Sequence, residues 1–233
     1  MIIECVADLH GFYPKMEGGD VLIVAGDLTK SNKQWQYLEF RNWLREQPHK
    51  HKIMICGNHD GCIEDGAFYF SDEWLGATYL RDEETIIDGI KFYGSPWTPY
   101  FEEVNPHCAS FMKPDQQLKE IWKKIPEDTD VLITHGPPFG IQDGIPTPYD
   151  GSLYHAGCKS LALEVGNRQK PPALWVFGHI HEGYGEDLAV RSEDCKMINC
   201  SYVNEKYKPV NKPIRIELWR EKDGHAKTRT MRI

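Results

Sequence analysis

Side chains able to bind a metal or move a proton follow five separate aliphatic runs of this chain. The runs end in Asp8-Leu9-His10, Gly26-Asp27, Gly57-Asn58-His59-Asp60, Thr134-His135-Gly136 and Gly178-His179-Ile180-His181. Carboxylate, amide and imidazole groups are ligands for divalent first-row metals, and imidazole also transfers protons. Each segment alone could be a polar turn or a capping residue with a surface histidine. Their repetition at the ends of aliphatic runs is harder to explain in that way, so we expect one shared site.

The number of these side chains predicts a pair of metal ions. Seven of them can donate oxygen or nitrogen: Asp8, His10, Asp27, Asn58, His135, His179 and His181. Seven ligands are too many for one four- to six-coordinate ion, and they suit two ions that share a bridging carboxylate. No cysteine is among them, which favours a hydrolytic site over a structural zinc site.

The aliphatic runs predict the strands that position these side chains. The expected strands cover residues 2–7, 21–25, 53–56, 131–134 and 174–177. A helix that Ser31 or Asn32 caps, ending near residue 46, separates the second strand from the third. Strands joined in this βαβ manner bring their carboxyl ends to one sheet edge, where open α/β sheets hold their active sites. Gly57 is expected to form the sharp turn that leaves the third strand.

The remaining elements are shorter. We expect a helical turn over residues 71–75 and strands over 78–80, 85–88, 90–93, 195–199 and 214–219, with a terminal edge strand within 224–233. Asp88-Gly89 predicts a hairpin turn, and Asp115 is expected to cap a helix with an apolar stripe. A further helix is expected from residue 155 to 165.

Composition limits the class of protein. The chain has 233 residues and no linker-like segment, so we expect a single domain over residues 1–233. A formal charge of −8 argues against an extended nucleic-acid footprint. No apolar run approaches the roughly 20 residues of a membrane span, and no signal peptide is recognisable. The seven cysteines are scattered and are expected to be reduced thiols, which fits a cytoplasmic protein.

Aromatic residues suggest a substrate pocket but do not define it. Trp97, Tyr100 and Phe101 lie in a proline-rich segment that could be a packed loop or a pocket wall. Phe139 precedes a Gly/Pro/Asp-rich loop over residues 140–154, which is long enough to suggest a function. His155 could cap a helix, pack, or reach the site.

In sequence order, the five segments resemble the five motif blocks of the calcineurin-like metallophosphoesterase superfamily, from Asp8 to His181. Three further segments resemble the small metallophosphoesterase-domain-containing (class III cyclic nucleotide) phosphodiesterases. They are Thr134-His135-Gly136-Pro137-Pro138, His155-Ala156-Gly157-Cys158 and residues 199–213. The resemblance implies an α/β fold, a four-layer α-β-β-α sandwich of two mixed sheets.

The resemblance also implies a role for each residue. Asp8, His10 and His181 would hold one metal, Asn58, His135 and His179 the other, and Asp27 would bridge both. His59 would contact the substrate phosphate and protonate the leaving oxygen, with Asp60 orienting its ring. The cofactors would be two divalent ions, manganese first, with iron, zinc, nickel, cobalt or magnesium as alternatives.

The implied activity is hydrolysis of a nucleotide-like phosphodiester, such as a cyclic nucleotide or a 2′,3′-cyclic phosphate, by a metal-bridging hydroxide. Lys30 stands where purple acid phosphatases carry a metal-binding tyrosine, and no Arg-Gly pair follows Asp27 as in protein phosphatases. A phosphomonoesterase, a nuclease of the same superfamily and a catalytically quiet nucleotide-binding scaffold remain alternatives. The expected partner is a small phosphodiester or nucleotide, and the oligomeric state is left open.

Overall fold

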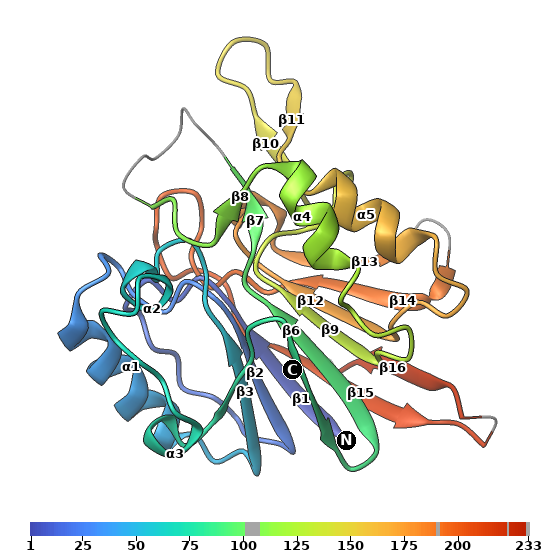
Figure 1. Ribbon diagram of the computed structural model, residues 1–233, viewed down its shortest axis with the longest axis horizontal. Coiled ribbons are helices and arrows are strands. Elements are labelled where there is room, and N and C mark those ends of the chain that lie inside the picture. Colours follow the sequence, from blue (N-terminus) through green and yellow to red (C-terminus); the bar gives the residue numbers. More distant parts are fainter. Residues whose placement is uncertain (101–107, 190–191, 223, 232–233) are drawn as a thin grey trace.

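The computed structural model describes residues 1–100, 108–189, 192–222 and 224–231, and it has two mixed six-stranded sheets (Figure 1). The first sheet has the order β16 (Ala226–Thr230), β15 (Ile214–Arg220), β1 (Ile2–Val6), β2 (Val21–Ala25), β3 (His51–Ile55) and β4 (Thr78–Tyr79). The second has the order β13 (Gly185–Ala189), β14 (Ser192–Asn199), β12 (Leu174–Phe177), β9 (Val131–Thr134), β6 (Ile90–Ser95) and β5 (Glu83–Ile87).

Helices cover the outer faces of both sheets, which confirms the four-layer sandwich (Figure 1). Beside the first sheet lie α1 (Gln34–Glu46), α2 (Gly61–Glu64) and α3 (Asp72–Leu75). Beside the second lie α4 (Asp115–Trp122) and α5 (Lys159–Gly166). Two small sheets, β7 (Thr98–Pro99) with β8 (Met112–Lys113) and β10 (Gly144–Pro146) with β11 (Leu153–His155), and the 3-10 helix η1 (His181–Gly183) complete the described elements.

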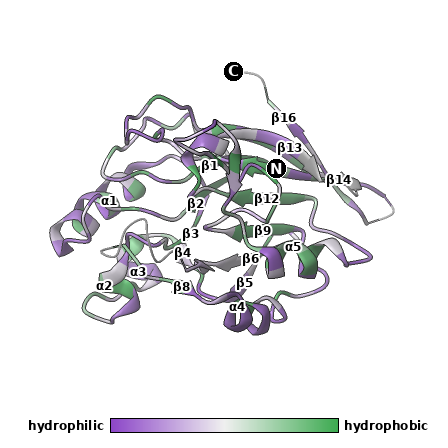
Figure 2. Cartoon of the chain, turned by 90° about the horizontal axis from the view of Figure 1, so that it is seen from above, coloured by the Kyte–Doolittle hydropathy of each residue, from purple (hydrophilic) through white to green (hydrophobic). Residues whose placement is uncertain are grey.

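Alternation along the strands explains why both sheet faces are buried. Ile23 of β2 packs between the two sheets, whereas its neighbours Leu22 and Val24 pack towards the helices. Successive side chains of a strand point to opposite faces, and a strand buried on both faces is apolar throughout. Figure 2 shows the result, with hydrophobic strands such as β9 and β12 inside and largely hydrophilic helices such as α1 outside.

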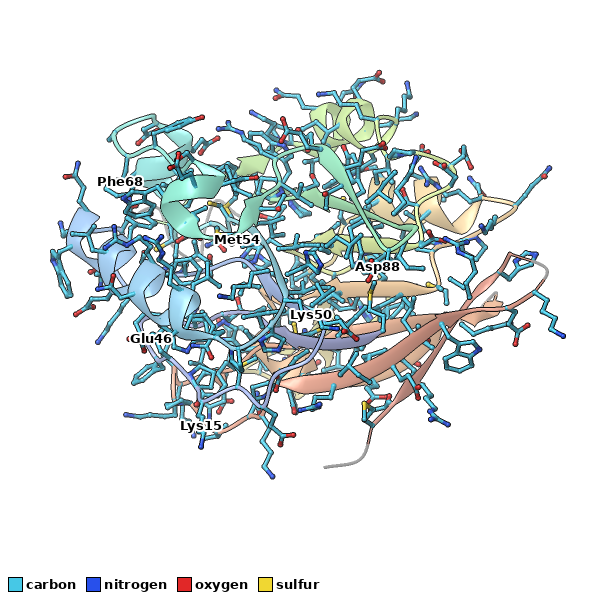
Figure 3. All side chains as sticks on the ribbon, turned by 90° about the horizontal axis from the view of Figure 1, so that it is seen from below. Lys15, Glu46, Lys50, Met54, Phe68 and Asp88 are labelled. Atoms are coloured by element: carbon cyan, nitrogen blue, oxygen red, sulfur yellow. The ribbon has the colours of Figure 1, made fainter. Side chains whose placement is uncertain are left out.

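The central strands run as predicted. β1, β2 and β3 are parallel neighbours, as are β9 and β12, so their carboxyl ends point the same way within each sheet. The Asp88-Gly89 hairpin turn joins β5 to β6, with φ of 49° at Asp88 and 76° at Gly89. Figure 3 shows the molecule from the end opposite to these carboxyl ends. Asp88 and Lys50, which are labelled there, lie just before β6 and β3. No helix in the described part of the chain is long and apolar enough to cross a bilayer.

Several predicted boundaries need correction. The residue capping α1 is Lys33, and the residue capping α4 is Pro114, so Ser31, Asn32 and Asp115 do not occupy the cap positions. The segment 140–154 was expected to be a loop, but much of it forms the β10–β11 hairpin. His155 ends that hairpin and pairs with Gly144, and α5 starts only at Lys159. Proline and glycine are typical of loops, so the sequence of this segment did not predict two paired strands.

Candidate metal centre

The seven predicted ligands meet where the strands of both sheets end. Backbone hydrogen bonds join the segments that carry them: the Asp8 amide donates to Gly26, the His10 amide to Asp27, and the Gly178 amide to His135. Five of the ligands are buried, namely Asp8, His10, Asp27, Asn58 and His135, while His179 and His181 are partly buried. The expectation of one shared site is therefore met, although the ligands come from two sheets and not one.

The first group of ligands is Asp8, His10 and His181. Their donor atoms lie within 4.8 Å of one another, with 3.7 Å between His181 Nε2 and Asp8 Oδ1. Within the described residues, neither ring nitrogen of buried His10 makes a hydrogen bond. Burying a polar atom without a partner is costly, so a nitrogen left in this way fits a metal ligand. His181 Nδ1 lies 3.1 Å from the Asn204 carbonyl, which leaves Nε2 facing Asp8.

The second group surrounds His135. Its Nε2 lies 3.0 Å from Asn58 Oδ1 and 3.3 Å from Asp27 Oδ1, and its ring centroid is 4.9 Å from that of His179. His135 Nδ1 lies 2.9 Å from the Ala25 carbonyl. A carbonyl at one ring nitrogen fixes the proton there and leaves the other nitrogen to bind metal.

Asp27 stands between the two groups. Its Oδ1 faces His135, and its Oδ2 lies 3.5 Å from His10 Nε2. A carboxylate whose oxygens face different ligand sets is placed to bridge two ions. Oxygen and imidazole donors in these numbers fit divalent first-row metals, so the residues present suit a two-metal centre.

Four of the seven ligands have a left-handed backbone. The φ angles are 52° at Asp8, 45° at His10, 54° at Asp27 and 69° at His179. Such angles are uncommon for residues other than glycine, and strained residues cost about 1–3 kcal/mol each. Left-handed φ angles at four of the seven predicted ligand positions support a function for these positions.

The charges of the site also fit metal binding. Burial alone would raise the pKa of Asp27, but the surrounding His135, His59 and His10 hold that pKa well below its usual range. Burial lowers the pKa of His135, but Asp27, Asp8 and the Ala25 carbonyl together raise it to about 9. A cation that binds here would therefore displace protons from imidazole.

His59 and Asp60 have different roles. The His59 backbone amide donates to Asp27 Oδ1 at 2.9 Å, while its side-chain Nε2 lies 4.0 Å from Asp27 Oδ2. The Asp60 carboxylate accepts hydrogen bonds from the amides of Gly57 and Leu28, at 2.8 Å and 3.2 Å. The prediction that Asp60 orients the His59 ring is thus not what the structure shows, since His59 Nδ1 faces Cys108 Sγ at 3.4 Å. Asp60 instead fixes the backbone turn that carries Asn58 and His59.

The aromatic residues expected at the substrate pocket lie elsewhere. Trp97 is buried in the core, where its indole donates to Asp82 at 2.9 Å. Tyr100 is exposed, and Phe101 lies outside the described residues. Phe139 and His155 pack against each other beside the β10–β11 hairpin, with ring centroids 5.4 Å apart. None of the four described residues is among those lining the cavities at the metal centre.

Two cavities open onto the metal centre, with volumes of about 560 Å³ and 290 Å³. Both are lined by Asn58, His59, Cys108 and Tyr207, so they form one cleft with His59 at the junction. The larger cavity is also lined by His10, Phe12, Lys30, Ser31, Asn32, Gly61, Ser110, Lys206 and Lys208.

Tyr207 is a site residue that sequence reasoning missed. Its ring centroid lies 4.8 Å from that of His10 and 5.2 Å from that of His181. Asn204 organises the loop that carries Tyr207. Its side-chain oxygen accepts hydrogen bonds from the backbone amides of Lys206 and Lys208. The resemblance of residues 199–213 to one phosphodiesterase group pointed to this loop, but no metal-ligand spacing singled out a residue in it.

Comparison with known proteins agrees with this site. The family model "Calcineurin-like phosphoesterase" matches residues 3–183. The chain is 36% identical to human metallophosphoesterase domain-containing protein 1, over 92% of this chain and 70% of that protein. It is 32% identical to UPF0046 protein K07C11.7 of Caenorhabditis elegans, over 91% of this chain and 73% of that protein.

A solved structure shows the same fold. The crystal structure of TT1561 of Thermus thermophilus superposes with a TM-score of 0.56 and 14% sequence identity, and the match covers 99% of each chain. Five of the predicted ligands, Asp8, His10, Asp27, His135 and His181, belong to groups whose donor atoms lie within 4.8 Å of one another, and the family model covers the segments that carry them. The chain belongs to the calcineurin-like phosphoesterase family.

Proposed function

We propose that this protein is a phosphodiesterase with two divalent metal ions, which hydrolyses a small, nucleotide-like phosphodiester. The observation that carries the proposal is the position of Asp27, with one carboxylate oxygen towards His10 and the other towards His135. When bound, two divalent ions would activate water and neutralise charge on the phosphate group. Manganese is the first metal to test, because imidazole and carboxylate donors accept several ions.

Three residues near the metal ligands have further roles in this proposal. His59 lies at the junction of the two cavities, where its Nε2 can donate a proton to the leaving oxygen of the substrate. Tyr207 also lines both cavities, and its ring packs edge-on against the rings of His10 and His181. Asp60 holds the turn that presents His59, through its hydrogen bonds to the Gly57 and Leu28 amides.

The shape of the cleft favours a diester over a monoester. Cavities extend from His59 in two directions, and a phosphodiester has two alcohol groups to place in them. A monoester would fill one. A small substrate is also consistent with the formal charge of −8, which disfavours a long nucleic acid.

The test compares two chromogenic substrates. Metal-stripped protein is reloaded with manganese, iron(II), cobalt, nickel, zinc or magnesium, and kcat/KM is measured for bis-p-nitrophenyl phosphate and p-nitrophenyl phosphate. We expect the diester to be preferred, and Asp27→Asn to lose both bound metal and most turnover. The matched control is Glu73→Gln, which removes one charge from an exposed position on α3.

Two outcomes would contradict this proposal. Preference for p-nitrophenyl phosphate would make the protein a phosphomonoesterase. Failure to hydrolyse the diester with all six metals would favour a nucleotide-binding scaffold without catalysis.

A further inference from the structure

The two arms of the cleft differ in charge. The larger cavity, here called the basic arm, is lined by Lys30, Lys206 and Lys208, and its described lining includes no carboxylate. The smaller cavity, here called the acidic arm, is lined by Glu182 and Glu205 in addition to Asp27. The acidic arm also presents the apolar side chains of Met112, Ile145 and Ile180. Apart from the predicted metal ligands, the two arms therefore present side chains of opposite charge to a ligand that spans the cleft.

The three lysines of the basic arm are not neutralised by buried ion pairs among the described residues. Among the described residues, Lys30 and Lys208 form no ion pair, and Lys206 pairs with its neighbour Glu205 at 3.7 Å. That pair is solvent-exposed, and exposed pairs contribute little to stability. The chain as a whole has 35 acidic and 27 basic residues, so a cavity with three lysines and no described carboxylate departs from the average surface.

The backbone holds the lysines close to the metal ligands. Lys30 follows Asp27 by three residues, in the segment between β2 and α1. Lys206 and Lys208 flank Tyr207, and the Asn204 side chain accepts both of their amides, at 3.1 Å and 3.0 Å. The Asn204 carbonyl faces His181 Nδ1, so the same residue connects the lysine loop to a metal ligand.

We propose that the basic arm binds a second anionic group of the substrate. The preferred substrate is then a phosphodiester with an additional phosphate or carboxylate on one of its two alcohol groups. That anionic side occupies the basic arm, because the lysines of this arm attract it and Glu182 lines the other arm. The uncharged side, such as a base or an aromatic ring, occupies the acidic arm against Met112, Ile145 and Ile180. This inference rests on the proposed phosphodiesterase function.

The test uses a matched pair of substrates with manganese-loaded protein. Thymidine 5′-(p-nitrophenyl phosphate) is compared with the same compound carrying a 3′-phosphate. We expect kcat/KM to be at least about tenfold higher for the 3′-phosphate, and the preference to shrink as salt is raised from about 0.05 M to about 0.5 M. A third compound with a 3′-succinate distinguishes a phosphate site from a general anion site.

Variants then connect the preference to the basic arm. Lys30→Gln and Lys208→Gln should each reduce the ratio of the two kcat/KM values by about three- to tenfold. Lys124→Gln is the control, because it removes the same charge from an exposed position beyond the end of α4. A ratio near one in the unmodified protein would overturn the inference, and so would a ratio that neither lysine variant changes.

The two proposals can fail separately. If bis-p-nitrophenyl phosphate is hydrolysed and the 3′-phosphate brings no advantage, the inference fails and the phosphodiesterase assignment stands. If no diester is hydrolysed, calorimetry compares the binding of thymidine 3′,5′-bisphosphate with that of thymidine 5′-monophosphate. The bisphosphate should then bind more tightly than the monophosphate, and Lys30→Gln and Lys208→Gln should weaken its binding. This result would support the anion site even though no diester is hydrolysed. Equal binding would refute it.

Discussion

Gly57→Ala is the sharpest test of how the metal centre is assembled. Gly57 was expected to allow a sharp turn, yet its φ is not among the positive values of this chain. Glycine is required at this position because a side chain would not fit between its neighbours. A Cβ atom at this position would lie 2.6 Å from the Asp27 amide nitrogen and 2.6 Å from His135 Cε1, and still closer to Asp27 Oδ1. One added methyl group would thus collide with both Asp27, the proposed bridging carboxylate, and His135, a proposed ligand of the second group.

The size of the effect follows from these contacts. Ordinary carbon contacts are about 3.5–4.0 Å, so Asp27 and His135 would each have to retreat by about 1 Å. The Asp27 amide belongs to the backbone and cannot rotate away as a side chain can. Overpacking of this kind costs about 1–3 kcal/mol of stability. A displacement of about 1 Å at a catalytic site can cost about 100-fold in rate.

The assay combines metal affinity, turnover and melting temperature. We expect Gly57→Ala to bind manganese more weakly by calorimetry and to lose about 100-fold in kcat/KM, with a decrease in Tm of a few degrees. Gly166→Ala is the matched control, because a Cβ at Gly166 has no atom within 4 Å. This variant should keep the wild-type metal affinity and turnover. Wild-type metal affinity and turnover in Gly57→Ala would refute the reasoning.

Three further predictions concern the acid, the metals and a distant buried pair. His59→Ala should keep its bound metal and lose about 100- to 10,000-fold in kcat, and loss of metal content would instead identify His59 as a ligand. Removing metals with a chelator should lower Tm by about 5–10 °C, if the ions are present at about 100 times their Kd, and scanning calorimetry with and without added manganese measures it. Glu4→Gln should lower the free energy of unfolding by about 2 kcal/mol, because buried Glu4 accepts hydrogen bonds from the amides of Glu17 and Gly18 and pairs with His49 at 2.9 Å. Burial would raise the pKa of Glu4, but these partners lower it, so the stabilisation is complete above pH about 4.5 and disappears as pH falls through the lowered pKa. Urea unfolding from pH 3 to 7 should show a flatter pH dependence in the variant, and an unchanged profile would contradict the assignment.

The positions of the candidate ligands could be predicted from the sequence because the strands that precede them are buried on both faces. Such strands are continuous aliphatic runs, and the residue after each run marks the end of a strand. Asp8 follows a mostly apolar segment that contains Glu4, Asp27 comes two residues after the end of an aliphatic run, and His135 directly follows another. The division into two sheets could not be predicted, since it depends on pairings between distant segments. β1 pairs with β15, more than 200 residues later in the chain, and no local pattern encodes this pairing.

The substrate cleft was not predictable for a different reason. Trp97 belongs to the core because Asp82 and Phe111 surround it, and both contacts form only in the folded chain. Tyr207 is part of the cleft because Asn204 organises a short loop without periodicity. A tertiary contact in one case and an irregular loop in the other decide whether the aromatic residue faces the core or a cavity, and residue type alone does not.

The pairing of β1 with β15 has a consequence for synthesis of the chain. β1 leaves the ribosome before β15, and one of its edges remains open until β15 has been made. An unpaired apolar edge can pair with other chains, so the nascent protein passes through an aggregation-prone stage. At about 5–20 residues per second, this stage lasts on the order of ten seconds or more. The first sheet is therefore completed only after most of the chain has been made, and a chaperone that shields β1 should raise the yield of active protein.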